Sequence, residues 1–183
     1  LSADCIRAVG TSAARDAANT GEFARLLRER AGIELEILSG KEEARLSYQA
    51  VRGDGSLSLP AGDLVVVDIG GGSAEFIHGD ETGIRFRTSL NCGAVRTTER
   101  FFASDPPTPP QLAEAAHWLD SQLAALPEFP SGAPFVGIGG TFVNLAGVRL
   151  GLAEFQADRL HGLALDAAEV ERQVALFASM PTG

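Results

Sequence analysis

The chain has 183 residues with 24 acidic and 15 basic side chains, a formal net charge of −9, and 45% hydrophobic residues. This composition is typical of a globular protein, and the negative charge argues against a basic face that binds nucleic acid. No run approaches the roughly 18 apolar residues of a membrane helix and no secretory leader opens the chain, so we expect a cytoplasmic protein without a membrane partner.

The first segment predicts strands that alternate with helices. Residues 5–11 form an apolar run typical of a buried strand, and residues 12–18 predict a short Ala-rich helical turn. Asn19, with Glu22 three residues on, is expected to cap the next helix, which ends at Gly32. This alternation favours an α/β layer.

A second strand and a third helix precede a linker. Residues 34–38 alternate in polarity as a strand does. Ser39 and Glu42 form a capping-box pattern, which predicts a helix that runs to about Arg52. Glycines and a proline punctuate residues 53–62, so we place the domain boundary in this surface linker.

The segment after the linker predicts a mixed sheet. Residues 64–68 are a continuous apolar run that ends in an aspartate, as in a central strand buried on both faces. Residues 74–78 and 85–90 predict two further strands joined by a turn at 81–83, and residues 135–138 a fourth. The hairpin strands make the sheet mixed rather than purely parallel.

Helices are expected to flank this sheet. Thr108 and Gln111 form another capping box, with prolines in the tolerated first-turn positions. A short strand is expected near Leu163. The predicted helices cover residues 94–102, about 109–126, about 141–150, and the stretch capped by Asp166 with Glu169.

A glycine-rich turn after Asp68 predicts an anion site. Consecutive glycines let backbone N–H groups approach an anion without obstruction by Cβ atoms. Glu75, on the returning strand, comes back near Asp68, and two carboxylates beside a phosphate imply a bound Mg²⁺ or a positioned water. The alternative is a plain hairpin with its acids in solvent. The turn consists of Gly70, Gly71, Gly72 and Ser73.

A second glycine turn, Gly139-Gly140-Thr141, lies between a predicted strand and a helix. Its amides and the helix N-terminus could hold another anion, although such junctions also occur without a ligand. No Gly-Lys-Ser/Thr follows, so this turn is not a Walker loop. With the single lysine, Lys41, backbone amides and divalent cations are the expected partners of phosphate.

Two adjacent acids open the predicted third helix. Glu42 fits the capping box, whereas Glu43 is free to project from the first turn and is the candidate general base. The alternative is that both acids only favour the helix N-terminus. Arg15, at a strand-to-helix junction, suits bidentate phosphate contact but equally suits an exposed surface position.

The remaining polar and sulfur-containing residues predict no further site. Cys5 and Cys92 are too few and too distant for a zinc site, and both are expected to be buried thiols. Arg96 and Arg100 lie four residues apart on one predicted helix and are interpreted as a solvated face. The three histidines, His78, His117 and His161, lack metal-ligand spacing and are interpreted as ordinary, with the alternative that His161 borders the site.

Together these segments resemble the exopolyphosphatase/guanosine pentaphosphate phosphohydrolase (Ppx/GppA) family. The resemblance is carried by Thr11–Asn19, Ser39–Leu46, Val67–Glu75, Gly137–Thr141 and Ser89–Phe101. It implies an actin-like (ribonuclease-H-like) α/β fold of mixed sheets with flanking helices. Residues 1–55 would then be the remnant of a first domain and residues 56–183 the second, with the site in the cleft between them.

The resemblance also implies an activity. The protein would be a hydrolase that releases the terminal phosphate of polyphosphate or of guanosine pentaphosphate, a stringent-response nucleotide, with Mg²⁺. Glu43 would activate the water, while Asp68 and Glu75 would position the metal and the water. The phosphate-binding residues it implies are Arg15, Gly70, Gly71, Gly72, Ser73, Gly139, Gly140 and Thr141.

Two departures from the family pattern qualify these expectations. Ala74 stands where the family usually has threonine, and the family's first phosphate loop would precede residue 1. The chain is therefore expected to be a fragment, which leaves the activity of the segment alone open. The alternative function is a noncatalytic ATP-, polyphosphate- or alarmone-binding regulator of the actin-like superfamily. Oligomeric state also stays open, with a homodimer as the candidate.

Overall fold

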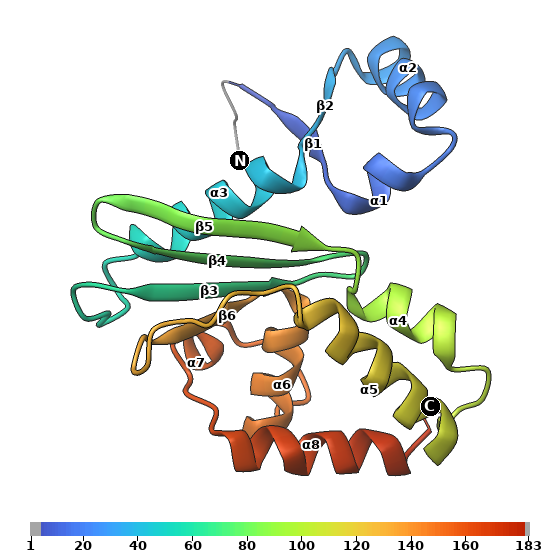
Figure 1. Cartoon of the computed structure of the whole chain (residues 1–183). Helices are drawn as coiled ribbons and strands as arrows, with labels where there is room; N and C mark the ends of the chain where they lie inside the picture. The colour runs from blue at the N-terminus through green and yellow to red at the C-terminus, as the bar shows by residue number, and fades with distance from the viewer. Residues whose placement is uncertain (1–4, 182–183) are drawn as a thin grey trace.

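The computed structural model describes residues 5–181, which form two sheets and eight helices (Figure 1). A small parallel sheet pairs β1 (Ala8–Gly10) with β2 (Leu35–Ile37). A larger sheet has the order β5-β4-β3-β6. Its strands are β3 (Leu64–Ile69), β4 (Ala74–Asp80), β5 (Gly83–Leu90) and β6 (Phe135–Ile138).

The larger sheet is mixed, as predicted. Strand β3 pairs antiparallel with β4 and parallel with β6, and β4 pairs antiparallel with β5. In this register Asp68 lies opposite Glu75 on one side and Ile138 on the other. Both glycine turns therefore leave the sheet at the same end.

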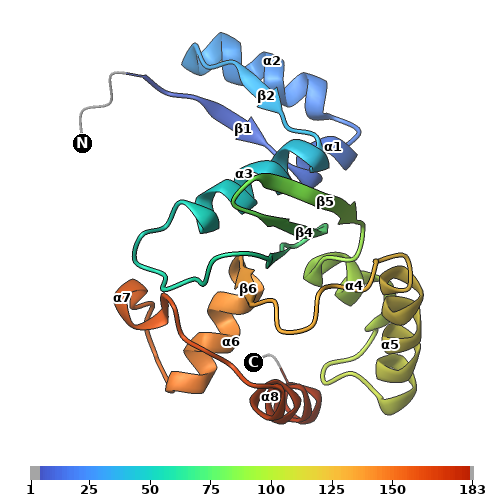
Figure 2. The same cartoon turned by 60° about the vertical axis from the view of Figure 1, so that its left-hand side comes forward.

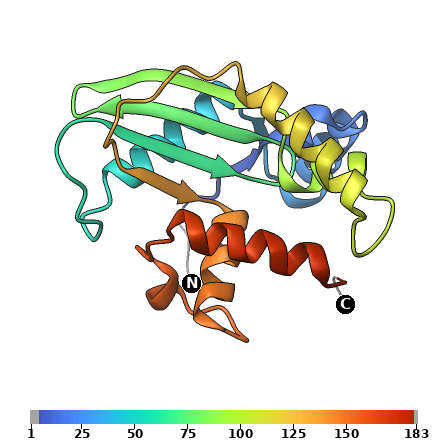
Figure 3. The same ribbon diagram turned by 60° about the horizontal axis from the view of Figure 1, so that its bottom comes forward.

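Helices cover both faces of the larger sheet. Figures 1 and 3 place α3 over one face and α6 and α8 over the other. No helix between residues 5 and 181 is long and apolar enough to cross a bilayer. The helices are α1 (Ser12–Asp16), α2 (Thr20–Ala31), α3 (Gly40–Arg52), α4 (Ala94–Phe101), α5 (Pro109–Leu123), α6 (Gly140–Leu150), α7 (Ala157–Leu160) and α8 (Ala167–Ser179).

Helix α3 is anchored to the larger sheet by one apolar face. Ala44, Tyr48 and Val51 have the i, i+4, i+7 spacing that places side chains on one side of a helix. They form one buried cluster with Leu64, Val66 and Ile77 of β3 and β4. Because Glu43 precedes Ala44, this packing fixes the start of α3 beside the end of β3.

The smaller sheet and its two helices form a separate layer. Figures 1 and 2 show β1, β2, α1 and α2 stacked beyond the N-terminal end of α3. Helix α3 itself packs against β3, β4 and β5. The division into domains at residues 55 and 56 stays a prediction.

Helix caps follow the sequence signals in most places. Ser39 Oγ accepts a hydrogen bond from the Glu42 N–H at 3.2 Å, and Gln111 completes the box at Thr108. The Glu42 carboxylate, however, binds Arg45 instead of returning to the N-cap. Asn19 occupies the N-cap position of α2, but its side chain makes no capping hydrogen bond.

Three expectations for the ends of the chain are wrong. Residues 5–11 form a strand only over Ala8–Gly10, and no residue of that strand is buried. The stretch around Leu163 forms no strand, because it follows a turn at Gly162 with φ of +70° and has no neighbouring strand to pair with. Cys5 is exposed rather than buried, since the small sheet does not cover it, whereas Cys92 is buried as expected. Burial raises the pKa of the Cys92 thiol.

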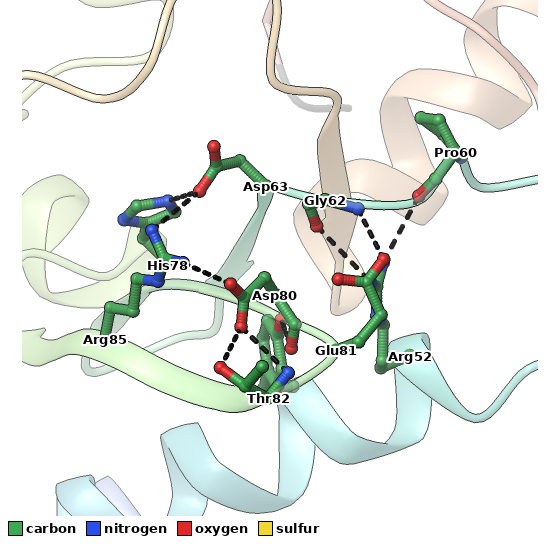
Figure 4. Close-up of polar contacts among 10 residues, drawn as sticks. Arg52, Pro60, Gly62, Asp63, His78, Asp80, Glu81, Thr82 and Arg85 are labelled. Carbon is green, nitrogen blue, oxygen red and sulfur yellow. Dashed lines mark hydrogen bonds and ion pairs between the residues drawn. The ribbon is translucent and has the colours of Figure 1, made fainter.

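The linker is tied to the far end of the larger sheet, away from the glycine turns (Figure 4). Arg52 donates to the carbonyl oxygen of Gly62 at 3.2 Å and pairs with Glu81 at 2.9 Å. His78 lies 2.8 Å from Asp63. This histidine therefore has a structural partner, in agreement with its interpretation as ordinary.

Candidate functional site

The candidate site lies where β3 ends and β4 begins. Asp68 and Glu75 are cross-strand neighbours there, and the turn of residues 70–73 joins their strands. Asp68 Oδ2 accepts a hydrogen bond from Ser47 of α3 at 3.0 Å. Glu75 is only 1% exposed and accepts from Ser89 of β5 at 2.7 Å. The predicted pair of carboxylates is thus brought together and held by hydroxyl groups.

The glycine turn has its carbonyl oxygens occupied and its amides available. The start of α4 donates to the carbonyl oxygens of all three glycines, through the N–H groups of Gly93, Ala94 and Arg96 at 2.9 to 3.3 Å. Within residues 5–181, the N–H groups of Gly71 and Gly72 make no hydrogen bond. Free, adjacent N–H groups on a turn are the arrangement that binds an anion.

Burial perturbs the two carboxylates of the turn. Desolvation raises the pKa of Asp68, against the opposing effect of the Ser47 hydrogen bond, and the Glu43 charge raises it further. Desolvation likewise raises the pKa of Glu75, opposed by hydrogen bonds from Ser89 and Ser73, with the charges of Glu43 and Asp68 adding to the rise. The folded protein therefore holds three mutually repelling acids in one place, which is typical of functional sites.

Glu43 and Arg15 meet at the start of α3. Arg15 Nη1 lies 2.8 Å from the Glu43 carboxylate, and the same nitrogen donates to the carbonyl oxygen of Leu38 at 2.8 Å. The side chains of Arg15 and Glu43 are 22% and 18% exposed, so the pair is sheltered but reachable. Arg15 is thus placed beside the candidate base, and within residues 5–181 it makes no hydrogen bond to the glycine turn.

The second glycine turn abuts the first. A Cβ atom built on Gly139 would lie 2.5 Å from Asp68 Oδ1, and the φ of this glycine is +86°, so only glycine fits. Thr141 Oγ1 donates to the carbonyl oxygen of Ile69 at 2.9 Å, which commits its proton to the protein. The backbone at Gly140 and Thr141, rather than the threonine hydroxyl, would therefore face a phosphate.

The chemistry of the carboxylates is compatible with Mg²⁺. Neither Asp68 nor Glu75 forms an ion pair in the described part of the chain, although Glu75 is buried and Asp68 partly buried among polar groups. Mg²⁺ prefers oxygen ligands and is often bound by one or two carboxylates together with water and phosphate oxygens. Across residues 5–181, no group of three His, Cys, Asp or Glu side chains could hold a metal ion by itself. The residues fit a site that substrate oxygens complete.

Several site residues carry no recognisable sequence signal. Ser47 and Ser89 are ordinary in type and lie on elements far from the glycine turn in sequence, so only the fold shows their bonds to the carboxylates. The interpretation of Arg96 as solvated is wrong: its Nε donates to the carbonyl oxygen of Gly72 at 2.8 Å, and its Nη2 pairs with Asp16. Arg100 instead lies over the rings of Phe101 and Trp118. Gly93, immediately before α4, was the sequence signal that could have indicated a close approach of this helix to the glycine turn.

Comparison with known proteins places the chain in a family. The model of the Ppx/GppA phosphatase family matches residues 1–179. Exopolyphosphatase 2 of Mycobacterium tuberculosis is 34% identical over 168 residues, which cover 87% of this chain and 51% of that protein.

Solved structures give the same result. The Ppx/GppA family member from Aquifex aeolicus is 31% identical, with a TM-score of 0.80 over 96% of this chain and 56% of that one. An exopolyphosphatase-like protein is 33% identical, with a TM-score of 0.87 over 97% of this chain and 58% of that one. The chain thus spans about half the length of these relatives, and the predicted α/β fold class with mixed sheets and flanking helices is confirmed. The chain belongs to the Ppx/GppA phosphatase family.

Proposed function

We propose that the chain is the core of a phosphohydrolase that releases the terminal phosphate of inorganic polyphosphate or guanosine pentaphosphate. One observation carries the proposal: the ionisable groups of Glu43, Asp68 and Glu75 interact with one another beside a turn whose amides are free. The exopolyphosphatase names of relatives support polyphosphate as the substrate class. The site offers a terminal phosphate a backbone cradle and a carboxylate base.

In the proposed mechanism, the amides of Gly71 and Gly72 bind the terminal phosphate, and Glu43 accepts a proton from water as the water oxygen attacks phosphorus. The bridging P–O bond breaks, and the shortened chain leaves with its electron pair. Arg15 moves from Glu43 toward phosphate oxygens, which frees the base as the substrate arrives. Catalysis of this kind depends on positioning and charge neutralisation more than on covalent chemistry.

Asp68 and Glu75 would hold Mg²⁺, which, when bound, neutralises charge on phosphate oxygens. The chain's own contribution is to fix the two carboxylates with Ser47 and Ser89 at 3.0 and 2.7 Å. Within residues 5–181 neither carboxylate has a cationic partner, and desolvation raises the pKa of each. A cation would relieve that cost.

The test is phosphate release from polyphosphate and from guanosine pentaphosphate by the longest natural protein that contains this chain. Removing a general base costs about 10²- to 10⁴-fold in rate, so Glu43→Gln is expected to lower kcat by that much. Glu42→Gln is the matched control, because Glu42 adjoins Glu43 but binds Arg45. Equal rates for wild type and Glu43→Gln would refute the proposal.

A noncatalytic binding protein is the second candidate. The observation in its favour is that Glu43 is engaged by Arg15 rather than free. Calorimetry that finds tight binding of ATP or polyphosphate, together with no phosphate release by the same protein, would establish this candidate instead.

A further inference from the structure

We propose that Arg96 is a positioning residue that locks the 70–73 turn in its anion-accepting form and joins it to α1. The inference rests on the proposed function, because it takes the turn to be the phosphate cradle. Arg96 makes no contact with the carboxylates of Glu43, Asp68 and Glu75 in the described part of the chain, so its role is indirect. Its role would be to decide which way the peptide groups of the turn face.

The contacts of the turn with α4 all have the same sense. The carbonyl oxygens of the three glycines accept hydrogen bonds from the start of α4, and that of Gly72 accepts a second one from Arg96 Nε at 2.8 Å. In a trans peptide unit the N–H group of the next residue points away from the carbonyl oxygen, so holding the Gly70 and Gly71 oxygens presents the N–H groups of Gly71 and Gly72 on the other side. Arg96 acts on two peptide units of the turn: its backbone N–H holds the Gly71 oxygen at 3.0 Å, and its Nε fixes the adjoining Gly72–Ser73 unit, where the backbone bond from the Gly93 N–H is long at 3.3 Å.

The same guanidinium reaches the other layer of the molecule. Arg96 Nη2 pairs with Asp16, the last residue of α1, and Arg15 precedes Asp16 in the chain. A Cβ atom on Gly72 would lie 2.5 Å from Ser12 Oγ, so α1 and the turn are already in contact. Arg96 thus links the turn to α1, and Arg15 of the same helix binds Glu43.

These contacts require the shape of the guanidinium as well as its charge. Because the guanidinium is planar, Nε donates to the Gly72 carbonyl oxygen while Nη2 donates to the Asp16 carboxylate. A lysine ammonium is a single point and would lose that fixed geometry. The two readings differ in a measurable way: if Arg96 only supplied positive charge to a phosphate, lysine would replace it, and Asp16 would be a competitor.

The experiment measures the Kd of tripolyphosphate with Mg²⁺ by calorimetry, using the same natural protein, for five forms. These are the wild type and the variants Arg96→Ala, Arg96→Lys, Asp16→Asn and Arg100→Ala. Loss of a hydrogen bond to a charged group is expected to weaken binding about tenfold in Arg96→Ala, and nearly as much in Arg96→Lys and Asp16→Asn. Arg100→Ala, the control one turn along α4, should bind as the wild type does. Tm is measured for each form, to separate a local change from loss of folding.

Two results would overturn the inference: wild-type affinity in Arg96→Lys, or tighter binding in Asp16→Asn. Amide hydrogen exchange measured without ligand tests the same inference even if the variants differ in stability or the protein binds no tripolyphosphate. The amides of Gly93, Ala94 and Arg96 donate to the turn, so their exchange should quicken about tenfold in Arg96→Lys if the lock is real. Unchanged exchange refutes the lock. Faster exchange without tripolyphosphate binding refutes the proposed function alone.

Discussion

Gly93→Ala is expected to deform the glycine turn from outside. Gly93 is the N-cap of α4 with φ of −68° and ψ of 167°, angles that alanine adopts without strain. The added Cβ, however, would lie 2.5 Å from the carbonyl carbon and oxygen of Gly71 and 2.6 Å from the Ser73 nitrogen. The obstacle is therefore backbone, which cannot rotate away as a side chain does.

The magnitude follows from the displacement. Ordinary contact needs at least 3.4 Å, so the turn and α4 must separate by about 1 Å. Overpacking costs roughly 1–3 kcal/mol, and contact with three backbone atoms places this variant near 3 kcal/mol. For a protein of this size each kcal/mol lowers Tm by about 2–4 °C, which gives a fall of about 6–12 °C.

Thermal unfolding followed by circular dichroism, with tripolyphosphate binding alongside, is the measurement. Gly147→Ala is the control, because Gly147 lies within α6 with no atom near its Cβ position. That variant should gain about 0.5–1 kcal/mol from helix propensity. A Gly93→Ala protein that melts within about 1 °C of the wild type and binds tripolyphosphate equally well would refute the reasoning, since the overpacking cost would be absent.

Two further predictions concern pH. Burial raises the pKa of Glu75, so the ionised form of this residue destabilises the fold at neutral pH. Glu75→Gln should therefore raise Tm at pH 8, and the increase should shrink as the pH falls toward the raised pKa. A difference in Tm that does not depend on pH would contradict this. Hydrogen bonds from Arg172 and Gln173 hold the pKa of Glu169 at about 2, below its usual 4.5, so Glu169 stabilises the fold above pH 4.5 and less as pH falls toward 2. Glu169→Gln should therefore lower Tm at pH 7, and a difference from wild type that persists undiminished at pH 2 would exclude this cause.

The parts of the fold that depend on local signals could be predicted from the sequence. Helix α3 begins at Gly40 and ends at Arg52, as the cap at Ser39 and the following glycine indicate. The strands that bracket the first glycine turn were likewise marked by an apolar run and by glycines. Residue 163 shows the limit of such signals, because an apolar stretch becomes a strand only where a partner strand is available, and none pairs with it within residues 5–181.

The candidate site divides in the same way. Asp68, Glu75 and the glycines are adjacent in sequence, so their proximity was predictable from one hairpin. Arg96 was not, because its helix meets the turn from more than 20 residues away and its spacing from Arg100 matches a solvated face equally well. Only tertiary contact separates two arginines one helical turn apart, one against a carbonyl oxygen and the other against aromatic rings.

The charge of the site bears on the form in which a phosphate chain would bind. Within residues 5–181, the three acids Glu43, Asp68 and Glu75 form one ion pair, that of Glu43 with Arg15, and the pKa of Asp68 and Glu75 is raised. A bare polyanion would add repulsion to an already strained set of carboxylates, whereas the amides of the turn supply only partial positive charge. We therefore expect polyphosphate to bind together with its divalent cations. Removing Mg²⁺ should then lower the affinity for polyphosphate more in the wild type than in Glu75→Gln, because the variant has one fewer negative charge to offset.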